Sequence, residues 1–388
     1  MQDDIDDLPL RGLRVLDFAQ FLAGPVAALR LSDLGAEVIK IERPQGGDLC
    51  RAMVVNDQRL DGDSLVFHTF NRGKKSVAAD LKKPGDLEDV RRLIASADVM
   101  IHNFRPGVME RIGLGYDAVR ALNPRLIYGA VSGYGGDGPW RDKPGQDLLV
   151  QALSGIAWLN GNDGDGPVPT GFAMLDVAAA GHLVQGILAC LVRRGVTGRG
   201  GLVEVDLMSA AIDMTFEQLT CFLNADGQAP RRHAQGNANP YQPAPYGIYR
   251  TADGYMALAM TPLDRLAELL EEPRIAAFGQ DQAFARLDEI KAVVADVLAL
   301  RPTPAWLGIL EPAGVWCAPV LDWPSFTRSE GFAALDPLMT IRGASGAEAR
   351  TTRCPIRIDG RAPRSTAAAP ALGADTAAVL EPLRQAVS

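Results

Sequence analysis

The chain has 388 residues, of which 47% are apolar and 22% charged, and this composition argues against disordered and fibrous classes. Its formal net charge of −8 argues against a general affinity for nucleic acid or anionic membranes. Any polyanionic ligand has to be met by local basic clusters. At this length the chain can form one large α/β domain with an appendage, or more than one domain.

The first residues are acidic and lack the basic start and apolar core of a secretory signal. No stretch approaches the roughly 18 uninterrupted apolar residues of a membrane-spanning helix. The five cysteines are widely spaced without a C-x-x-C pair, and the four histidines lack zinc-ligand spacing. We therefore expect a cytoplasmic protein with no disulfide framework, no metal, and no membrane or nucleic acid partner.

Short β-rich runs alternate with longer helical patterns through the first 207 residues. This alternation is typical of a parallel sheet covered by helices, and it predicts an α/β fold. The predicted strands are 14–18, 37–42, 76–81, 98–103, 125–132 and 202–207. The predicted helices are 24–35, 86–96, 117–122, 146–156, 176–194 and 208–223.

The pattern changes at about residue 225. A loop-rich stretch over 224–247 precedes a predicted hairpin over 248–260, and helical patterns cover about 263–300. These features indicate a second, smaller domain. The tail from about residue 361 is rich in Ala and Pro and ends in a predicted short helix, so we expect it to lie on a surface.

Basic residues gather in or beside the predicted strand ends, where α/β sheets bind ligands. They are Arg43, Arg72, Lys74, Lys75, Arg105 and Arg111. Arginine and lysine together suit a phosphate-rich ligand, although a solvated charged face explains their spacing equally well. Asn103 and Phe104 add a hydrogen-bonding group and an aromatic face of the kind that adenine needs.

Glycine patterns exclude several functions. The segment "LDFAQFLAGP" has one glycine where the dinucleotide fingerprint needs three, which counts against a nucleotide-binding oxidoreductase. The chain has no G-x-S-x-G and no phosphate-binding P-loop motif. The glycines of "SGYGGDGP" (132–139) follow a predicted strand and can bring backbone N–H groups to a ligand, although most such segments are simply turns.

Asp176 stands at the start of a predicted helix, in a stretch of small residues, and the next charged residue is Arg193. As an N-cap, Asp176 would contribute about 1 kcal/mol by accepting a backbone N–H. The same amides would keep its carboxylate ionised, as a nucleophile requires. The residues themselves leave both interpretations open. His182, six residues later, fits a core or surface position better than a base.

Eight blocks of the sequence, in this order, resemble the class III CoA-transferase family of the CaiB/BaiF type, which also contains the α-methylacyl-CoA racemases. They cover most of residues 10–260 and include "LRVLDFAQFLAGP", "LSDLGAEVIKIERPQGGD", "NRGKKSVAADLK", "ADVMIHNFRPGVMERIGLGYD", "NPRLIYGAVSGYGGDGP", "PGQDLLVQALSG", "TGRGGLVEVDL" and "PAPYGIYRTADGYMALA".

The resemblance implies a Rossmann-like large domain with a parallel sheet, a smaller α+β domain, and a homodimer of two interlocked chains. The implied large, CoA-binding domain comprises 1–205 and 328–388. The implied linker helix is 206–225 and the implied small domain is 226–327.

The resemblance also implies that the chain exchanges CoA between an acyl-CoA and a small carboxylic acid, with coenzyme A as a substrate and no permanently bound cofactor. Asp176 is the implied nucleophile, acting through an aspartyl mixed anhydride and an aspartyl-CoA thioester. The implied contacts of the CoA phosphates are Arg43, Arg72, Lys75, Arg105 and Arg111. Adenine or pantetheine would lie near Asn103 and Phe104, and the reactive end would be lined by Tyr134 and Gly135.

The chain departs from the family's formyl-CoA transferases at two places. Leu22 stands where they carry a glutamine, and the stretch 231–245 has a single glycine, Gly236, instead of a polyglycine lid. The racemases use a histidine at the position of Gln146, which cannot exchange a proton at neutral pH. A racemase and a CoA-binding protein without catalysis remain the alternatives. Arg231, Arg232 and His233 hint at an acceptor with a second carboxylate, but a solvated loop explains them equally well.

Overall fold

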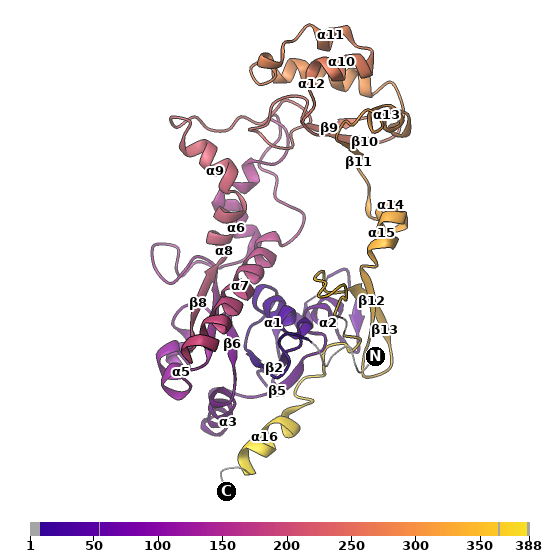
Figure 1. The fold of residues 1–388 in the computed structure, drawn as a ribbon. Helices are drawn as coiled ribbons and strands as arrows, with labels where there is room; N and C mark the ends of the chain where they lie inside the picture. Colours follow the sequence, from indigo (N-terminus) through magenta and orange to yellow (C-terminus); the bar gives the residue numbers. More distant parts are fainter. Residues whose placement is uncertain (1–7, 54, 364, 386–388) are drawn as a thin grey trace. The chain divides into compact units, whose positions relative to one another are not determined.

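The computed structural model describes residues 8–53, 55–363 and 365–385 (Figure 1), so most of the acidic start of the chain lies outside the described residues. The described residues fall into two compact units. Unit 1 is drawn from Met1–Val150, Ala173–Ala211 and Leu335–Ser388, and unit 2 comprises Gln151–Phe172 and Ile212–Ala334.

Unit 1 is built on a parallel six-stranded sheet with the strand order β5-β2-β1-β6-β7-β8. The chain winds outward from β1 first to one side and then, from β6, to the other. This is the doubly wound order of a Rossmann-type sheet, whose switch point lies between β1 and β6. The predicted α/β class is confirmed. The strands are β1 (Arg14–Asp17), β2 (Glu37–Glu42), β5 (Lys75–Ala78), β6 (Val99–His102), β7 (Ile127–Ser132) and β8 (Gly201–Asp206).

Helices cover both faces of the sheet because its side chains alternate between two apolar layers. Leu16, Met100 and Tyr128 belong to a buried cluster with side chains from the helices of one face. A Cβ on Gly129 would instead meet Leu183 on the other face. The first face is covered by α3 (Pro84–Ala95), α5 (Tyr116–Leu122) and α16 (Thr376–Gln385), and the second by α1 (Ala23–Asp33) and α7 (Met174–Thr197).

The 24-residue helix α7 packs closely on the sheet and on α1 (Figure 1). A Cβ added at Gly186 would lie 2.4 Å from Val203 Cγ1, so glycine permits the close approach of α7 to β8. By length and composition alone α7 could cross a membrane, with a mean hydropathy of 1.7 over 18 residues. The sequence analysis expected no spanning segment, because no run of about 18 residues is apolar without interruption. Helices α12 (Leu287–Leu298) and α13 (Thr303–Leu310) meet the same criterion together, but they are bent by 112° at the break between them.

The end of the chain covers the edge strand β5. The Ser76 N–H donates to Asp375 Oδ2 at 2.8 Å, and the Ala78 N–H donates to Thr376 Oγ1 at 2.9 Å. Side chains thus satisfy an edge that would otherwise remain open. The predicted terminal helix is confirmed. Elements of unit 1 that the sequence did not predict are β3 (Arg59–Leu60), β4 (Asp63–Ser64), α2 (Leu65–Asn71), α4 (Val108–Arg111), β12 (Leu338–Arg342) and β13 (Glu348–Thr352).

Unit 2 contains the predicted hairpin, formed by β9 (Gly247–Arg250) and β10 (Tyr255–Leu258), with β11 (Cys317–Pro319) as a third antiparallel strand. The predicted helix over 208–223 is broken at Thr215 into α8 (Leu207–Met214) and α9 (Phe216–Leu223). Helices α6 (Asp147–Ser154) and α8 each have residues in both units. The remaining helices are α10 (Leu263–Leu270), α11 (Pro273–Ala276), α12 (Leu287–Leu298), α13 (Thr303–Leu310), α14 (Trp323–Arg328) and α15 (Glu330–Leu335).

Candidate active site

A cavity of about 520 Å³ opens at the carboxyl ends of the parallel strands in unit 1. Its walls come from the segment after β1 (20–23), the segment after β6 (103–106) and the end of β7 (131–133), together with Asp176 on α7. It therefore lies at the switch point between β1 and β6, where doubly wound sheets bind their ligands.

Two glycines form one corner of this cavity. A Cβ on Gly133 would lie 2.4 Å from the Cα of Gly145, and a Cβ on Gly145 would lie 2.5 Å from the Cα of Gly133. Any side chain at either position would push the two backbone segments apart. This contact holds Gln146 and Asp147, which follow directly, against the cavity.

Asp176 lines the cavity, but it is not the N-cap of α7. Ala173 occupies the N-cap position without a side-chain cap, and Asp176 lies in the first turn. The amides of Leu175 and Asp176 donate to Asp147 Oδ2, at 2.8 and 3.1 Å. The expectation that the amides of its own helix stabilise the Asp176 carboxylate is therefore wrong, because the buried Asp147 carboxylate accepts from them instead.

The environment of Asp176 raises its pKa to about 6. Burial is the largest cause, and the negative charge of Asp147 adds to it. A hydrogen bond from the backbone amide of Ala23, at the start of α1, acts in the opposite direction. The carboxylate is still largely ionised at pH 7, but it is less well stabilised than an ordinary aspartate.

Asn103 and Phe104 both line the cavity. Both ends of the Asn103 side-chain amide are bonded to the backbone of Gln20. Asn103 Oδ1 accepts from the Gln20 N–H at 2.8 Å, and Asn103 Nδ2 donates to the Gln20 carbonyl at 2.6 Å. The Phe104 ring stacks on His102, with ring centroids 6.1 Å apart. Asn103 thus holds the segment after β1, and Phe104 offers the cavity an aromatic face.

Three cations line the cavity: Arg105, Arg141 and Lys143. Arg111 is close to them, because a Cβ on Gly107 would lie 3.2 Å from its Nη1 and 4.0 Å from Arg141 Nη2. Sequence reasoning found Arg105 and Arg111 but missed Arg141 and Lys143. The sequence does carry a basic pair in "WRDKPGQD", but this segment does not directly follow a predicted strand, so it was not among the candidate phosphate contacts.

The structure does not bring Arg72 or Lys75 into this cavity. The Arg72 guanidinium is 1% exposed and bonded to both carboxylate oxygens of Asp33, because α1 passes over it. Lys75 begins β5 at the amino ends of the parallel strands, away from the cavity, and pairs with Glu37. Lys74, the third cation of this stretch, is buried and bonded to Asp17 at 2.7 Å.

The other predicted residues do not line the cavity. Arg43 follows β2 and donates to the Gly47 carbonyl at 3.0 Å. The Tyr134 hydroxyl donates to the Pro144 carbonyl at 3.3 Å, and the Gly135 N–H donates to Ser132 Oγ at 2.9 Å. These bonds hold the turn after β7, and Ser132 and Gly133 of that turn do line the cavity.

The basic residues of the 231–233 stretch already have partners within unit 2. Arg231 pairs with Asp288 at 2.6 Å. Arg232 donates to the carbonyls of Asn160, Asp165 and Gly166. These contacts hold the loop, so nothing here supports a role for this stretch in binding a second carboxylate. Within the described ranges no cluster of three or more His, Cys, Asp or Glu side chains could hold a metal ion.

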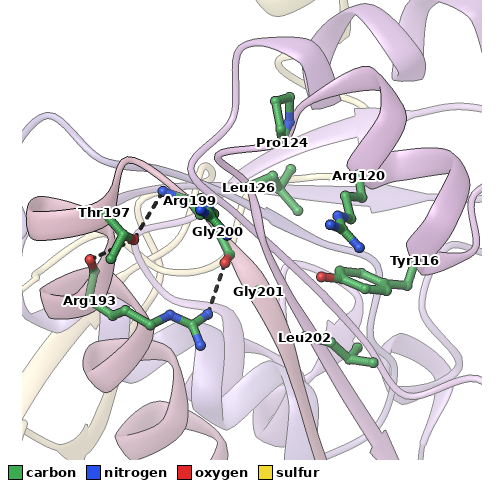
Figure 2. A pocket seen from close by; sticks show the side chains of 10 residues that line it. All are labelled: Tyr116, Arg120, Pro124, Leu126, Arg193, Thr197, Arg199, Gly200, Gly201 and Leu202. Atoms are coloured by element: carbon green, nitrogen blue, oxygen red, sulfur yellow. Dashed lines mark hydrogen bonds between the residues drawn. The ribbon is translucent and has the colours of Figure 1, made fainter.

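A second depression, of about 500 Å³, lies beside the amino ends of β7 and β8 (Figure 2). Its walls include Tyr116, Arg120, Arg193 and Arg199, and Arg193 donates to the Gly200 carbonyl at 2.9 Å. None of the described residues that line it is an acid or a cysteine. It therefore offers no nucleophile comparable with Asp176.

Comparison with known proteins places these features in a family. Residues 10–376 match the family model described as CoA-transferase family III. The chain is 36% identical to the acetyl-CoA:oxalate CoA-transferase of Acetobacter aceti, over 81% of each chain. It is 34% identical to the probable fatty acyl-CoA transferase Rv3272 of Mycobacterium tuberculosis, over 90% of this chain and 91% of that one.

Solved structures are similar to this chain over nearly its whole length. A CAIB/BAIF family protein from Brucella suis matches with a TM-score of 0.82 at 30% identity, over 97% of this chain and 99% of that one. A crystal structure of Rv3272 also matches with a TM-score of 0.82, at 31% identity, over 96% of this chain and 99% of that one.

Proposed function

Because this chain belongs to CoA-transferase family III, we propose that it moves CoA from an acyl-CoA donor to a small carboxylic acid with Asp176 as the covalent nucleophile. The observation that carries the proposal is the position of Asp176. It is a half-buried carboxylate with a raised pKa, facing a cavity with a basic rim at the switch point of the sheet.

In the first half of the proposed reaction an Asp176 oxygen attacks the carbonyl carbon of the donor thioester. The C–S bond breaks, and CoA leaves as a thiolate beside an aspartyl mixed anhydride. The thiolate then attacks the aspartyl carbonyl carbon, which gives an aspartyl-CoA thioester and releases the donor acid as a carboxylate. Covalent catalysis divides one difficult exchange into steps of similar energy.

In the second half the acceptor carboxylate attacks the aspartyl-CoA carbonyl carbon and expels the CoA thiolate, forming a new anhydride. The thiolate attacks the acceptor's acyl carbon, and Asp176 leaves as a free carboxylate. No net proton transfer is needed. Water would hydrolyse the anhydride, so the apolar walls contributed by Phe21, Met53 and Phe70 suit this chemistry by excluding it.

The raised pKa of Asp176 supports the proposed role. A carboxylate that is poorly stabilised by its surroundings gains more from forming a neutral acyl derivative than a well-solvated one. The Ala23 amide, at the positive end of α1, keeps the group ionised and oriented. For the CoA phosphates we propose Arg105, Arg141 and Lys143, which line the cavity, and Arg111, which lies close to Arg141, with Phe104 beside the adenine or pantetheine.

The test is the variant Asp176→Asn, incubated with acyl-CoA donors and analysed by peptide mass spectrometry. Asn keeps the size and an acceptor oxygen but cannot form the anhydride. We expect wild-type protein to carry CoA or an acyl group on Asp176, and the variant to bind CoA without an adduct or exchange. Asp117→Asn, which removes an exposed carboxylate from the first turn of α5, is the matched control and should retain both.

Wild-type exchange by freshly prepared Asp176→Asn would refute the proposal. The remaining alternatives give different results. A racemase would wash deuterium into C2 of a 2-methylacyl-CoA, which pure CoA exchange does not. A binding protein without catalysis would take up CoA and never form the adduct.

We further propose an interlocked homodimer in the cytoplasm, with a large domain of 1–205 and 328–388, a linker helix of 206–225 and a small domain of 226–327. Exposed apolar side chains on α9 support an association, since Phe216 is 67% and Leu223 70% exposed. Sedimentation equilibrium that yields only the monomer mass would refute the dimer.

A further inference from the structure

The segment between β1 and α1, residues 18–22, has a strained backbone beside the proposed nucleophile. Phe21 adopts φ 64°, in the left-handed region that side chains other than glycine rarely occupy. Such a conformation is energetically unfavourable and persists only where the surrounding structure enforces it. The segment must therefore be held by contacts from outside.

Asn103, at the end of β6, provides two of these contacts. Its Oδ1 accepts from the Gln20 N–H at 2.8 Å, and its Nδ2 donates to the Gln20 carbonyl at 2.6 Å. One amide side chain thus binds both backbone groups of one residue, in the way that a neighbouring strand would. A carboxylate of the same shape cannot do so, because it would set an acceptor against the Gln20 carbonyl.

Lys40, in the middle of the sheet, provides the next contacts. Its ammonium donates to the Ala19 carbonyl at 2.7 Å and pairs with Asp48 at 2.9 Å. Asp48 Oδ1 in turn accepts from the Phe21 N–H at 3.2 Å. Lys40 is only 1% exposed, and the surrounding carboxylates outweigh burial and raise its pKa, so the ammonium stays charged.

These bonds hold Ala19, Gln20 and Phe21 in succession, and the chain then enters α1. The turn is tightly packed, because a Cβ on Gly24 would lie 2.2 Å from the Ala19 Cβ. Ala23 follows Phe21 by two residues and lines the same cavity as Asp176, and a hydrogen bond from its N–H lowers the pKa of that carboxylate. A shift of the Gln20 backbone would therefore be transmitted to the hydrogen bond on Asp176.

We propose that Asn103 is a positioning residue that, with the buried Lys40 behind it, holds the 18–22 segment so that the Ala23 amide meets Asp176. The catalytic meaning of this inference rests on the proposed function, whereas its structural content does not. It also changes the role that the family resemblance implied for Asn103. Because Gln20 occupies both ends of its amide, Asn103 acts on the reaction through the backbone and not through CoA.

Steady-state kinetics of Asn103→Ala and Asn103→Asp separate these roles. Misplacing a reacting group by about 1 Å can cost about 100-fold in rate, so we expect kcat to fall by about that factor while KM for acyl-CoA stays within about twofold. The acid limb of the kcat profile should also move to higher pH, because the Ala23 bond that lowers the pKa of Asp176 is lost. A raised KM with kcat retained would instead identify a CoA contact and overturn the proposal.

Hydrogen exchange of the 18–26 peptide tests the positioning without any activity. The amides should be protected in wild-type protein and exchange faster in Asn103→Ala, whether or not CoA transfer is ever observed. Asn123→Ala is the matched control, since Asn123 Nδ2 also bonds backbone carbonyls, at Ile94 and Ala97, on the far side of the sheet. Unchanged protection in a folded Asn103→Ala protein would overturn the proposal, and so would equal deprotection in the control.

Discussion

Replacing Asp176 with Asn should stabilise the folded protein at neutral pH while it removes CoA exchange. The structure places this carboxylate in a half-buried position next to the charge of Asp147. In the unfolded chain the same group is fully hydrated. Holding the charge in the folded state therefore costs free energy, and a neutral side chain of the same shape avoids that cost.

The magnitude follows from the pKa of Asp176. The value rises from 3.8 to about 6, and each unit corresponds to about 1.36 kcal/mol, so the cost at neutral pH is about 3 kcal/mol. Because the folded value lies above the unfolded one, this cost is absent below about pH 4, where the carboxyl is neutral in both states. It grows as pH rises from about 4 to about 6 and is constant above that.

The assay is urea unfolding of wild-type and Asp176→Asn protein at about pH 5 and about pH 7.5. The variant's advantage in free energy of unfolding should be roughly 1.5 kcal/mol at the lower pH and roughly 3 kcal/mol at the higher. Comparing the two proteins at each pH cancels the other titrating groups. An advantage that does not change with pH, or a variant less stable than wild type at about pH 7.5, would refute the argument.

Three further predictions concern the same site. In wild-type protein the acid limb of the kcat–pH profile should lie near pH 6. Asp147→Asn should move this limb to lower pH, because the variant removes a negative charge beside Asp176. A limb at the same pH in both proteins would show that Asp147 does not act on Asp176. Gly133→Ala should destabilise the protein by about 1–3 kcal/mol and impair CoA binding measured by calorimetry, because the added Cβ would lie 2.4 Å from the Cα of Gly145. Gly136→Ala is the control and should change neither stability nor binding, because its added Cβ meets nothing within 4 Å. Arg105→Gln should raise KM for acyl-CoA by about tenfold, the loss of about 1.4 kcal/mol expected for one exposed phosphate contact. Lys75→Gln should leave KM unchanged, because Lys75 lies at the amino end of β5 and the cavity lies at the carboxyl ends of the strands; a raised KM would contradict this assignment.

Sequence reasoning succeeded where the signal is local. Each predicted strand of the sheet is present, because buried parallel strands are short apolar runs that can be recognised one at a time. Asp176 could be identified at the start of a long helix from its isolation among small residues. The capping role failed because the amides of this helix bond Asp147, which is 29 residues away in the chain and carries no local sign of that contact.

The basic residues show the same division. The family resemblance implied five cations at the CoA phosphates, but Arg72 is bonded to Asp33, 39 residues earlier, and Lys75 lies at the amino end of β5, away from the cavity. Arg141 and Lys143 line the cavity although they follow no predicted strand. Charge identifies candidates for phosphate contact, and only the position of each residue in the sheet decides which of them reaches the ligand.

The sequence by itself determined the α/β class, the order of the elements and the presence of one carboxylate in a stretch otherwise free of charge, because these depend on residues close together in the chain. Tertiary structure alone decided which cations reach the cavity, how α7 is capped, and that the pKa of Asp176 is raised. Burial, ion pairing and hydrogen bonding at this site join residues that are tens of positions apart, so they exist only once the strands have taken their places in the sheet.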